Sequence, residues 1–256
     1  MKNQVVMERF PAYTQDMEFC FTQYLGSTSR YASSAPLLTT HKGKNMRVIA
    51  SLLAVAFVSG CAGKLDYVRP TISTAPSANY KVINKPREAV WNASVPELGK
   101  QFFVINNLDK SSGLINISYS GDPEKYIDCG RITSYVKNAR GERTYDFSGA
   151  KAQQSFEVMN GNGLFMIDRR MSVEGRVNLV FEEVSPNQTR VTANTRYVVQ
   201  RQQTVRNAAN NFPQSDSDSI SFNSGGSSSF TANADGRATE CIANGALERE
   251  ILSAIR

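Results

Sequence analysis

Histidine is almost absent from this chain. The 256 residues contain one, His41, and a single tryptophan, Trp91. If the segment around His41 is removed as a leader, the remaining protein has no imidazole, which excludes Ser-His-Asp and Cys-His catalysis and histidine-ligated metals. Without an ordinary general base near pH 7, we expect no enzyme activity, no metal and no cofactor.

The net charge is also small once the N-terminal segment is set aside. The whole chain has 29 Lys and Arg against 23 Asp and Glu, a formal net charge of +6. Removing the six basic and three acidic residues of 1–60 leaves 23 against 20. This near balance gives no nucleic-acid footprint, and no glycine-rich phosphate loop follows a predicted strand. We therefore expect no nucleic-acid or nucleotide partner.

An export signal lies inside the first sixty residues. Residues 41–47 are basic, and the eleven residues 48–58 are mostly apolar. Eleven residues rise about 16 Å as a helix, roughly half the hydrocarbon thickness of a bilayer, so the segment is too short to span it. This order of regions is typical of a secretory signal. Residues 1–45 precede a plausible start at Met46, so we interpret residues 1–60 as a signal peptide with an over-extended N-terminus.

The end of this signal resembles the lipobox of bacterial lipoproteins. It consists of an aliphatic residue, two small residues and a cysteine: Val58, Ser59, Gly60 and Cys61. The resemblance implies cleavage before Cys61, a diacylglycerol on its thiol and acylation of the new amino terminus. Two or three acyl chains suffice for stable membrane anchoring. The next residues are Ala62 and Gly63 and not aspartate, which by resemblance to enterobacterial sorting rules implies the outer membrane.

The cysteines of the remaining chain form a pair. Cys20 belongs to the discarded segment and Cys61 to the lipobox, which leaves Cys129 and Cys241 in an oxidising periplasm. An even pair in that compartment predicts a disulfide. The alternatives are two buried free thiols or a redox-active pair, although the Cys-x-x-Cys spacing of redox sites is missing.

Composition divides the mature chain into three kinds of segment. Residues 62–79 are rich in Ala, Ser, Thr and Pro, so we expect residues 61–79 to be a lipidated flexible linker. Residues 80–256 then form a single α+β periplasmic domain. Within it, Asn, Ser, Gly and Asp dominate residues 207–236, which predicts a mobile loop, with room for a frayed hairpin.

Alternating apolar and polar residues predict several strands in the domain. The predicted strands are residues 80–83, 103–108, 114–119, 131–136, 154–159, 171–184 and 189–199. The second and third form a hairpin with Gly113 at a turn position that needs positive φ. Pro86 begins a helix that Pro96 kinks or splits, and residues 246–256 form a C-terminal helix with an apolar stripe.

This order of elements resembles the helix-grip arrangement of the lipoprotein C subunit of the bacterial outer-membrane β-barrel assembly machine. Residues 86–91 (Pro-Arg-Glu-Ala-Val-Trp) and the hairpin at 103–117 carry the resemblance. It implies an α+β fold in which an antiparallel sheet packs against an N-terminal and a C-terminal helix. The serine-rich segment and the cysteine pair depart from that pattern, so the resemblance names no specific partner.

These observations favour a non-enzymatic outer-membrane lipoprotein that serves as a structural or accessory component of an envelope assembly. Its partners are then the membrane, through acyl chains on Cys61, and other envelope proteins. The alternative is a carrier or sensor of an apolar ligand held between sheet and helix. Four phenylalanines are candidates to line that cavity, although plain core is the simpler interpretation: Phe147, Phe156, Phe165 and Phe181.

Several arginines follow the strand patterns. They are Arg169, Arg170, Arg190, Arg196, Arg201 and Arg206. We interpret them as a solvated strand face beside acidic residues, the alternative being a surface for lipid headgroups or an acidic partner.

Overall fold

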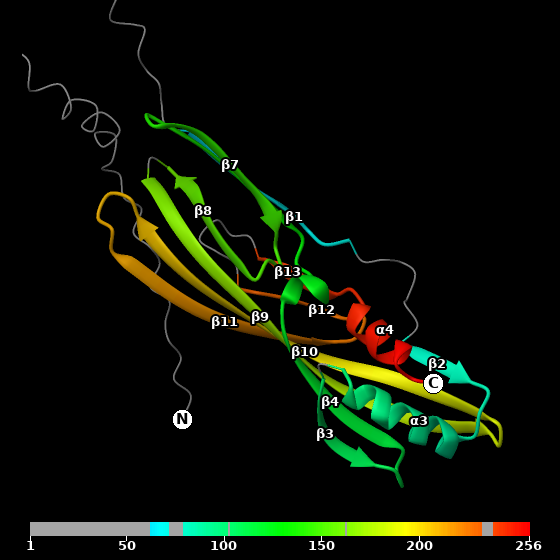
Figure 1. Ribbon diagram of the computed structural model, residues 1–256. Coiled ribbons are helices and arrows are strands. Elements are labelled where there is room, and N and C mark those ends of the chain that lie inside the picture. The colour runs from blue at the N-terminus through cyan, green and yellow to red at the C-terminus, as the bar shows by residue number, and fades with distance from the viewer. Residues whose placement is uncertain (1–61, 72–78, 102, 162, 232–237) are drawn as a thin grey trace, which may run out of the picture.

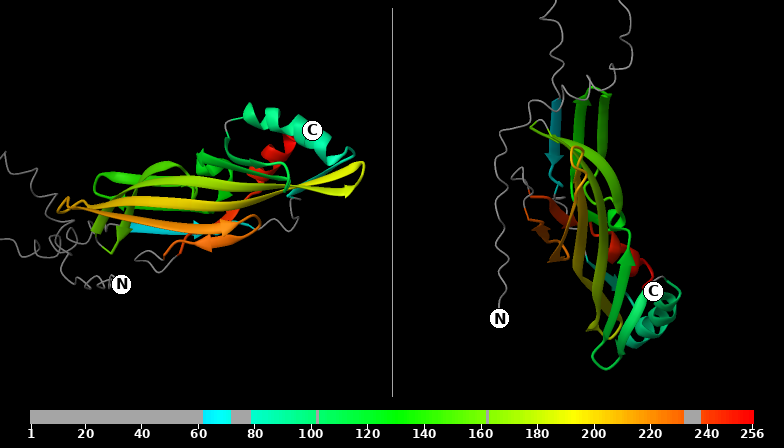
Figure 2. Two further views of the ribbon diagram at one scale, coloured as in Figure 1. Left: turned by 90° about the horizontal axis from the view of Figure 1, so that it is seen from below. Right: turned by 90° about the vertical axis from the view of Figure 1, so that its left-hand side faces the viewer.

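Two long strands run the length of the protein, and the other elements pack along them. The computed structural model describes residues 62–71, 79–101, 103–161, 163–231 and 238–256. In it, β9 (Gly163–Ser185) and β10 (Gln188–Asn207) form an antiparallel hairpin (Figure 1). We call its extremities the Gly163 end and the Ser185 end. A strand of 23 residues spans roughly 75 Å, and the molecule is correspondingly elongated (Figure 2).

Different strands flank the two halves of this hairpin. Towards the Ser185 end, β4 and β3 extend the sheet from β9, and β2 pairs with β10. Towards the Gly163 end, β8 pairs with β9 and β11 pairs with β10. The bounds of these strands are β2 (Tyr80–Ile83), β3 (Val104–Asp109), β4 (Leu114–Gly121), β8 (Gln153–Asn160) and β11 (Pro213–Asn223).

Two smaller antiparallel sheets cover parts of this large sheet. The first has the strand order β1-β6-β7 and packs against β8 near the Gly163 end. The second has the strand order β12-β13-β5, and its strand β5 comes directly after the short 3-10 helix η2 in the chain. Their elements are β1 (Ala62–Val68), β6 (Arg131–Asn138), β7 (Gly141–Ser148), η2 (Pro123–Lys125), β5 (Ile127–Asp128), β12 (Ser227–Ser229) and β13 (Glu240–Ala243).

The core follows the two-residue period of the strands. On β9, the odd-numbered residues from Met171 to Phe181 are buried, while Arg176, Asn178 and Glu182 are exposed on the other face. The alternation of apolar and polar residues thus gives β9 a packed and a wet face. A second, smaller cluster of Ile132, Phe147 and Phe156 joins the β1-β6-β7 sheet to β8 and β9. The protein is thus held by two apolar clusters, a large one from the middle to the Ser185 end and a small one near the Gly163 end.

Two α-helices occur among the described residues, and both lie on the packed face of the sheet. Helix α3 (Arg87–Gly99) packs on β9, β10 and β3 and continues past Pro96 without being split. Helix α4 (Ala246–Ser253) buries Leu247, Ile251 and Leu252 against β10. Gly175 permits this close approach, since a Cβ there would lie 2.6 Å from Leu247 Cδ2. Neither helix of the described part is long and apolar enough to cross a bilayer.

The predicted helix-grip α+β fold is wrong, because the protein is predominantly antiparallel β-sheet. The two helices have 13 and 8 residues and are far shorter than the packed face of β9 and β10. They cover that face from the middle towards the Ser185 end, whereas the β1-β6-β7 sheet covers it near the Gly163 end (Figure 2). The β1-β6-β7 sheet therefore covers part of the packed face that the sequence pattern assigned to helices.

Two segments that we expected to be flexible also contain strands. Residues 62–68 of the predicted linker form β1, which pairs with β6 from Ala62 opposite Lys137 to Val68 opposite Arg131. In the predicted mobile loop, β11 pairs along β10, and β12 pairs with β13. Ile220 and Phe222 point into the core from β11, and backbone hydrogen bonding holds the serine-rich remainder. Residues 72–78 and 232–237 lie outside the described residues.

Most of the other predicted elements are confirmed. The hairpin is β3 and β4, with φ of 68° at Gly113. The predicted strands at residues 80–83, 131–136 and 154–159 are β2, β6 and β8, and those at 171–184 and 189–199 are parts of β9 and β10. The C-terminal helix is α4, with its predicted apolar stripe buried.

Candidate functional site

The predicted lipidation site precedes the described part of the chain by one residue. Val58, Ser59, Gly60 and Cys61 lie outside the described residues, and Ala62 is the first residue of β1. Consecutive Cα atoms are about 3.8 Å apart, so Cys61 is joined directly to the β1-β6-β7 sheet. Both views of the ribbon place this start of β1 at the Gly163 end (Figures 1 and 2).

The predicted disulfide is confirmed. Cys129 and Cys241 are bonded, and both side chains are fully buried in the main core. Cys129 follows β5, and Cys241 lies in β13, so the bond reinforces a sheet in which these two strands share a register of only two residue pairs. The pair is structural and is not available for redox chemistry at the surface.

The four phenylalanines proposed to line one apolar cavity do not come together. Phe181 contacts Trp91 edge to face in the main core, with ring centroids 5.2 Å apart. Phe147 and Phe156 contact each other in the second cluster, at 4.9 Å. Phe165 is half-buried near the start of β9, opposite Val158. The interpretation as core holds for three of the four, and no common cavity joins them in the described structure.

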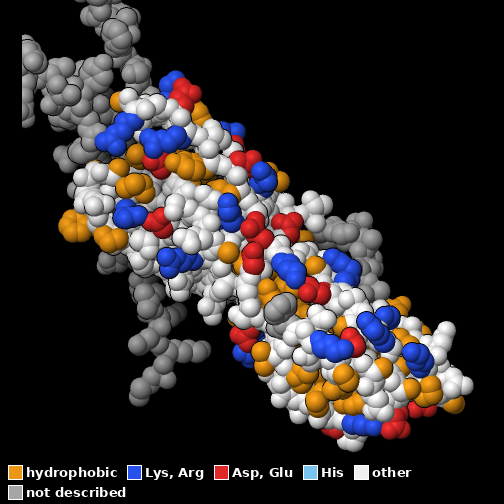
Figure 3. Space-filling model, in the orientation of Figure 1, with side chains coloured by type: hydrophobic (Ala, Val, Ile, Leu, Met, Phe, Trp, Pro, Cys, Tyr) orange, Lys and Arg blue, Asp and Glu red, His pale blue; other side chains and the backbone are white. Residues whose placement is uncertain are grey.

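Exposed hydrophobic side chains gather instead at the Ser185 end. Of the seven large hydrophobic residues that are exposed in the described chain, five lie on β2, on β3 or at the end of β9: Tyr80, Val82, Val104, Leu108 and Val184. Figure 3 shows hydrophobic surface over this end of the molecule, around α3 and β3. The strand register places Tyr80 and Val82 on the wet face and Leu108 on the face that carries α3, so exposed apolar side chains lie on both faces of the sheet at this end. We call these five residues, with the groove described next, the Ser185-end patch.

A shallow groove between α3 and β3 is the concave part of this patch. It has a volume of about 310 Å³, and its apolar lining comprises Trp91, Val95, Pro96 and Leu108. The indole of Trp91 is only 7% exposed, so it forms a rigid floor that is held from behind by Phe181. Such a groove fits one or two apolar side chains of a partner within a polar rim.

Polar side chains on the rim fix the position of α3 relative to the β3–β4 turn. Lys110 Nζ lies 2.7 Å from Glu88 Oε1 and donates to Asn92 Oδ1 at 3.4 Å. The hydrogen bond and the positive charge of Lys110 lower the pKa of Glu88. These groups are exposed, so the ion pair adds little stability but keeps both charges at the edge of the groove.

The neighbouring turn is organised by one carboxylate. Asp109 Oδ1 accepts hydrogen bonds from the Ser111 hydroxyl and backbone N–H, at 2.6 and 3.0 Å. The Ser112 hydroxyl and N–H donate to the same carboxylate, at 2.5 and 3.1 Å. These hydrogen bonds lower the pKa of Asp109 to about 2. The β3–β4 hairpin that carries Leu108 therefore ends in a well-defined turn.

The edge of β3 is less suited to a partner than the groove beside it. β3 is the last strand on its side of the sheet and is thus a candidate for pairing with another chain. Its register shifts between Ile105 and Asn107, which leaves Asn106 without a partner residue on β4. A bulge in an edge strand twists it and discourages further strand pairing. Side-chain docking in the groove is the better-supported mode.

A second groove, of polar character, lies on the wet face near the Gly163 end. We call it the arm groove; its volume is about 550 Å³, and it is lined by Gln153, Ser155, Asp168, Arg169, Arg170, Gln202, Thr204, Arg206, Asn211 and Pro213. Asp168 accepts a hydrogen bond from Ser155 at 2.5 Å and is ion-paired with Arg206. The side chain of Arg170 is exposed and makes no hydrogen bond or ion pair with another described residue. The groove therefore has an excess of positive charge.

Two of the predicted surface arginines are buried, which corrects the interpretation of a solvated face. Arg169 and Arg201 are 2% and 3% exposed. Arg169 lies over the Phe147 ring and donates to the Ser148 carbonyl at 3.3 Å. Burial, with the nearby positive charge of Arg201, lowers the pKa of Arg169 to about 10. Arg170, Arg190 and Arg196 are exposed, as predicted.

The second buried arginine is also held by an aromatic ring. The Arg201 guanidinium lies 4.5 Å from the centre of the Phe230 ring and 3.9 Å from Asp218. Arg169 Nε and Arg201 Nη1 have no hydrogen-bond partner in the described structure. The two arginines connect the long hairpin to β7 and to the segment after β12 through cation–π contacts, and we assign them a structural role.

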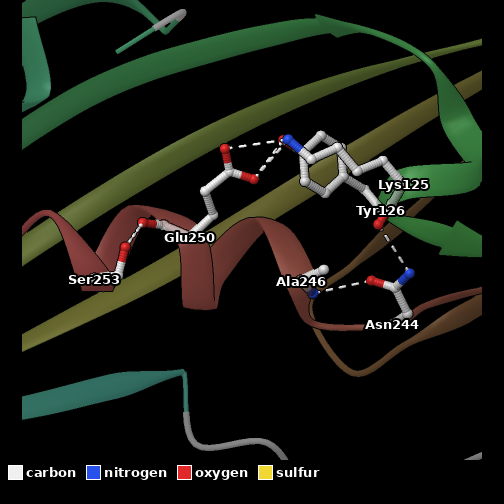
Figure 4. Close-up of polar contacts among 6 residues, drawn as sticks. All are labelled: Lys125, Tyr126, Asn244, Ala246, Glu250 and Ser253. Carbon is white, nitrogen blue, oxygen red and sulfur yellow. Dashed lines mark hydrogen bonds and ion pairs between the residues drawn. The ribbon is translucent and has the colours of Figure 1, made fainter. Parts of the chain in front are cut away.

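A polar clamp fixes α4 to the η2 segment (Figure 4). Glu250 Oε2 lies 2.9 Å from Lys125 Nζ and accepts from the Tyr126 hydroxyl at 2.8 Å. Burial and the Glu250 carboxylate raise the pKa of Tyr126 to about 12. Burial favours a higher pKa for Glu250, but the hydrogen bonds from Lys125 and Tyr126 outweigh it and lower that pKa. The clamp and the disulfide both connect the C-terminal segment, β13 and α4, to the chain around η2 and β5.

Sequence reasoning missed the two exposed residues that mark the ends of the molecule. Leu108 belongs to an alternating strand pattern and gave no sign that it would be exposed. Phe212 is 75% exposed in the β10–β11 turn, and an isolated aromatic residue in an asparagine-rich segment was a usable signal.

Within the described residues, no three His, Cys, Asp or Glu side chains are grouped closely enough to hold a metal ion.

Comparison of the chain with protein-family models finds no match, and searches of curated proteins and of solved structures find none either.

Proposed function

We propose that this protein is a lipoprotein anchored in the outer membrane by acyl chains on Cys61 and acting there, without catalysis, as an accessory component of an envelope assembly. The proposal joins the lipobox-like sequence to the two different ends of the fold. Its anchor enters at the Gly163 end, and the Ser185-end patch lies at the opposite extremity. The elongated sheet then carries the patch away from the membrane, where envelope proteins can reach it.

The observation that carries this proposal is the apolar groove between α3 and β3 at the Ser185 end, with Leu108 exposed at its edge. Apolar side chains around a groove with a charged rim are typical of protein–protein contact surfaces. We infer that the partner presents an apolar segment whose side chains enter the groove at Leu108 and Trp91. The alternative, a carrier of an apolar ligand, is less favoured, because the phenylalanines that suggested it belong to separate packing contacts.

The anchor is tested by replacing Cys61 with serine. A serine hydroxyl is too weakly acidic to act as the acylated nucleophile, so Cys61→Ser is expected to remain an unprocessed precursor. Labelling with a clickable fatty acid should be lost, and the band on a gel should shift to the precursor size. If the variant were still labelled and cut to the same size, the lipoprotein assignment would be wrong.

The partner surface is tested by placing a charge in the groove. Leu108→Asp is expected to abolish chemical crosslinks to other envelope proteins, because a carboxylate cannot be buried unpaired in an apolar contact. Val68→Asp is the matched control, since Val68 is 65% exposed and lies outside the Ser185-end patch. Crosslinking in intact cells followed by mass spectrometry measures both. Recovery of only the free monomer from the wild-type protein would contradict the proposal.

A further inference from the structure

The Gly163 end differs from the rest of the surface in what its turns expose. Three turns lie together there: β6–β7, β8–β9 and β10–β11 (Figures 1 and 2). The last of them presents Phe212, which is 75% exposed, the highest value among the exposed large hydrophobic residues of the described chain. The start of β1 at Ala62 lies at the same end, paired opposite Lys137, one residue before the β6–β7 turn begins at Asn138.

Positive charge accompanies this aromatic residue. Arg140 lies in the β6–β7 turn, is exposed, and its side chain makes no hydrogen bond or ion pair with another described residue. Pro213, the neighbour of Phe212, is directly opposite Arg206 in the β10–β11 register. Asn211 and Pro213 also form part of the wall of the arm groove, where the exposed Arg170 lies near the Arg206–Asp168 ion pair. Figure 3 shows Lys and Arg side chains at this end, as along the rest of the face.

We propose that the Gly163 end rests on the phospholipid surface, with Phe212 inserted at the level of the headgroups and Arg140 facing their phosphates. This inference rests on the proposed lipidation of Cys61. An acylated Cys61 is bonded to the first residue of β1, so no linker separates the sheet from the bilayer. Aromatic side chains favour the membrane–water interface, and arginine is attracted to anionic headgroups. The anchor, the aromatic residue and the cation are therefore all at one end.

The occupant of this surface is identified by where the anchor enters. A protein partner could also cover an exposed phenylalanine, but the acyl chains would hold this end against lipid continuously. The Ser185 end, which bears most of the other exposed hydrophobic residues, points the opposite way. We therefore expect the two apolar surfaces of the protein to have different occupants, lipid at Phe212 and protein at Leu108.

Tryptophan fluorescence in vesicles tests this directly, because the chain contains one tryptophan and it lies at the other end. The lipidated mature protein, which begins at Cys61, is reconstituted into phosphatidylethanolamine–phosphatidylglycerol vesicles with or without brominated acyl chains. In Phe212→Trp, brominated lipid is expected to quench the added fluorescence roughly twofold, as for an interfacial indole. The wild-type protein, which has only Trp91, should show no quenching.

A charge reversal tests the electrostatic part. Arg140→Glu in the Phe212→Trp background is expected to reduce the quenching, whereas Lys85→Glu should leave it unchanged. Lys85 is an exposed lysine between β2 and α3, and its side chain likewise has no partner among the described residues. Equal effects of the two reversals would remove Arg140 from the proposed contact.

The result separates this inference from the proposed function. If the protein incorporates fatty acid and remains on the vesicles, but Phe212→Trp is no more quenched than Trp91, the membrane contact is refuted and the anchor stands. If the protein incorporates no fatty acid, the proposed function fails, and the contact fails with it.

Discussion

At the scale of single residues, the clearest departure from sequence expectation is the arginine at position 169. It occupies an inward position between Ile167 and Met171, where the strand period calls for an apolar side chain. Its charge is offset by the Phe147 ring and one carbonyl, and Nε is left without a partner in the described structure. A desolvated guanidinium with so few partners destabilises the fold, which is also why its pKa falls.

Replacing this arginine by methionine is expected to stabilise the protein. Arg169→Met keeps a long flexible side chain at the site, removes a buried charge, and ends its repulsion with Arg201. Substitution of buried charges by apolar residues of similar volume is often neutral or stabilising by about 1–4 kcal/mol, and we expect a gain near the lower end. Urea unfolding followed by circular dichroism measures it. The control is Arg170→Met on the wet face, where the free energy of unfolding should not change; a loss of stability in Arg169→Met would show that the charge itself supports the fold.

At the scale of elements, the strands that the sequence predicted are those with a regular apolar alternation. Met171 and Val173 are separated by one polar residue, as are Val177 and Leu179, and the strand that they define is present. The missed strands lack this pattern. β11 begins with serine, aspartate and glutamine on both faces, and its inward residues Ile220 and Phe222 come only at its end.

Strand β1 was missed for a different physical reason. Its residues are ordered by pairing with β6, about 70 positions further along the chain, and nothing in residues 62–68 indicates that partner.

The helix-grip expectation was wrong for the same reason. Without β1 and β7, only helices were available to cover the packed face near the Gly163 end. The exposed positions of Leu108 and Phe212 likewise depend on which elements leave them uncovered. The disulfide could be predicted because the expected compartment and the even cysteine count indicate it without any geometry.

The disulfide is expected to contribute strongly to the stability of the central elements. It closes a loop of 112 residues, and in the chain-entropy model a loop of about 100 residues is worth about 4.7 kcal/mol, with losses of 2–5 kcal/mol measured in small secreted domains. Cys129→Ala/Cys241→Ala should therefore lose about 2–5 kcal/mol in the free energy of unfolding, as determined by urea titration.

In this double variant, helix α4 should stay docked until the sheet unfolds, because the Glu250 clamp and the buried apolar stripe of α4 remain. Early cleavage after Arg249 by trypsin, with the sheet still folded, would contradict this.

At the scale of the whole molecule, the fold separates two surfaces by the length of one hairpin. The Gly163 end has turns, the start of β1 and an exposed phenylalanine, and the Ser185 end has the groove between α3 and β3. The strands between them carry polar residues on the wet face and two apolar clusters on the other. β9 and β10 stay paired along their length, so this hairpin connects the two ends of the molecule without an intervening loop.

The continuous hairpin predicts how far the protein extends from a membrane. With Cys61 acylated and the Gly163 end on the lipid, the long hairpin stands away from the bilayer, and its 23-residue strand gives a protein layer about 70 Å thick. Neutron reflectometry of the lipidated protein on a supported bilayer measures this thickness. A flexible tether would let the molecule lie down, and the layer would then be closer to the width of two packed sheets and a helix, about 30 Å. Insertion of a ten-residue Gly-Ser linker between Cys61 and Ala62 provides the comparison: it should blur or thin the layer, whereas an unchanged thickness would show that the direct entry of the chain into β1 does not set the orientation.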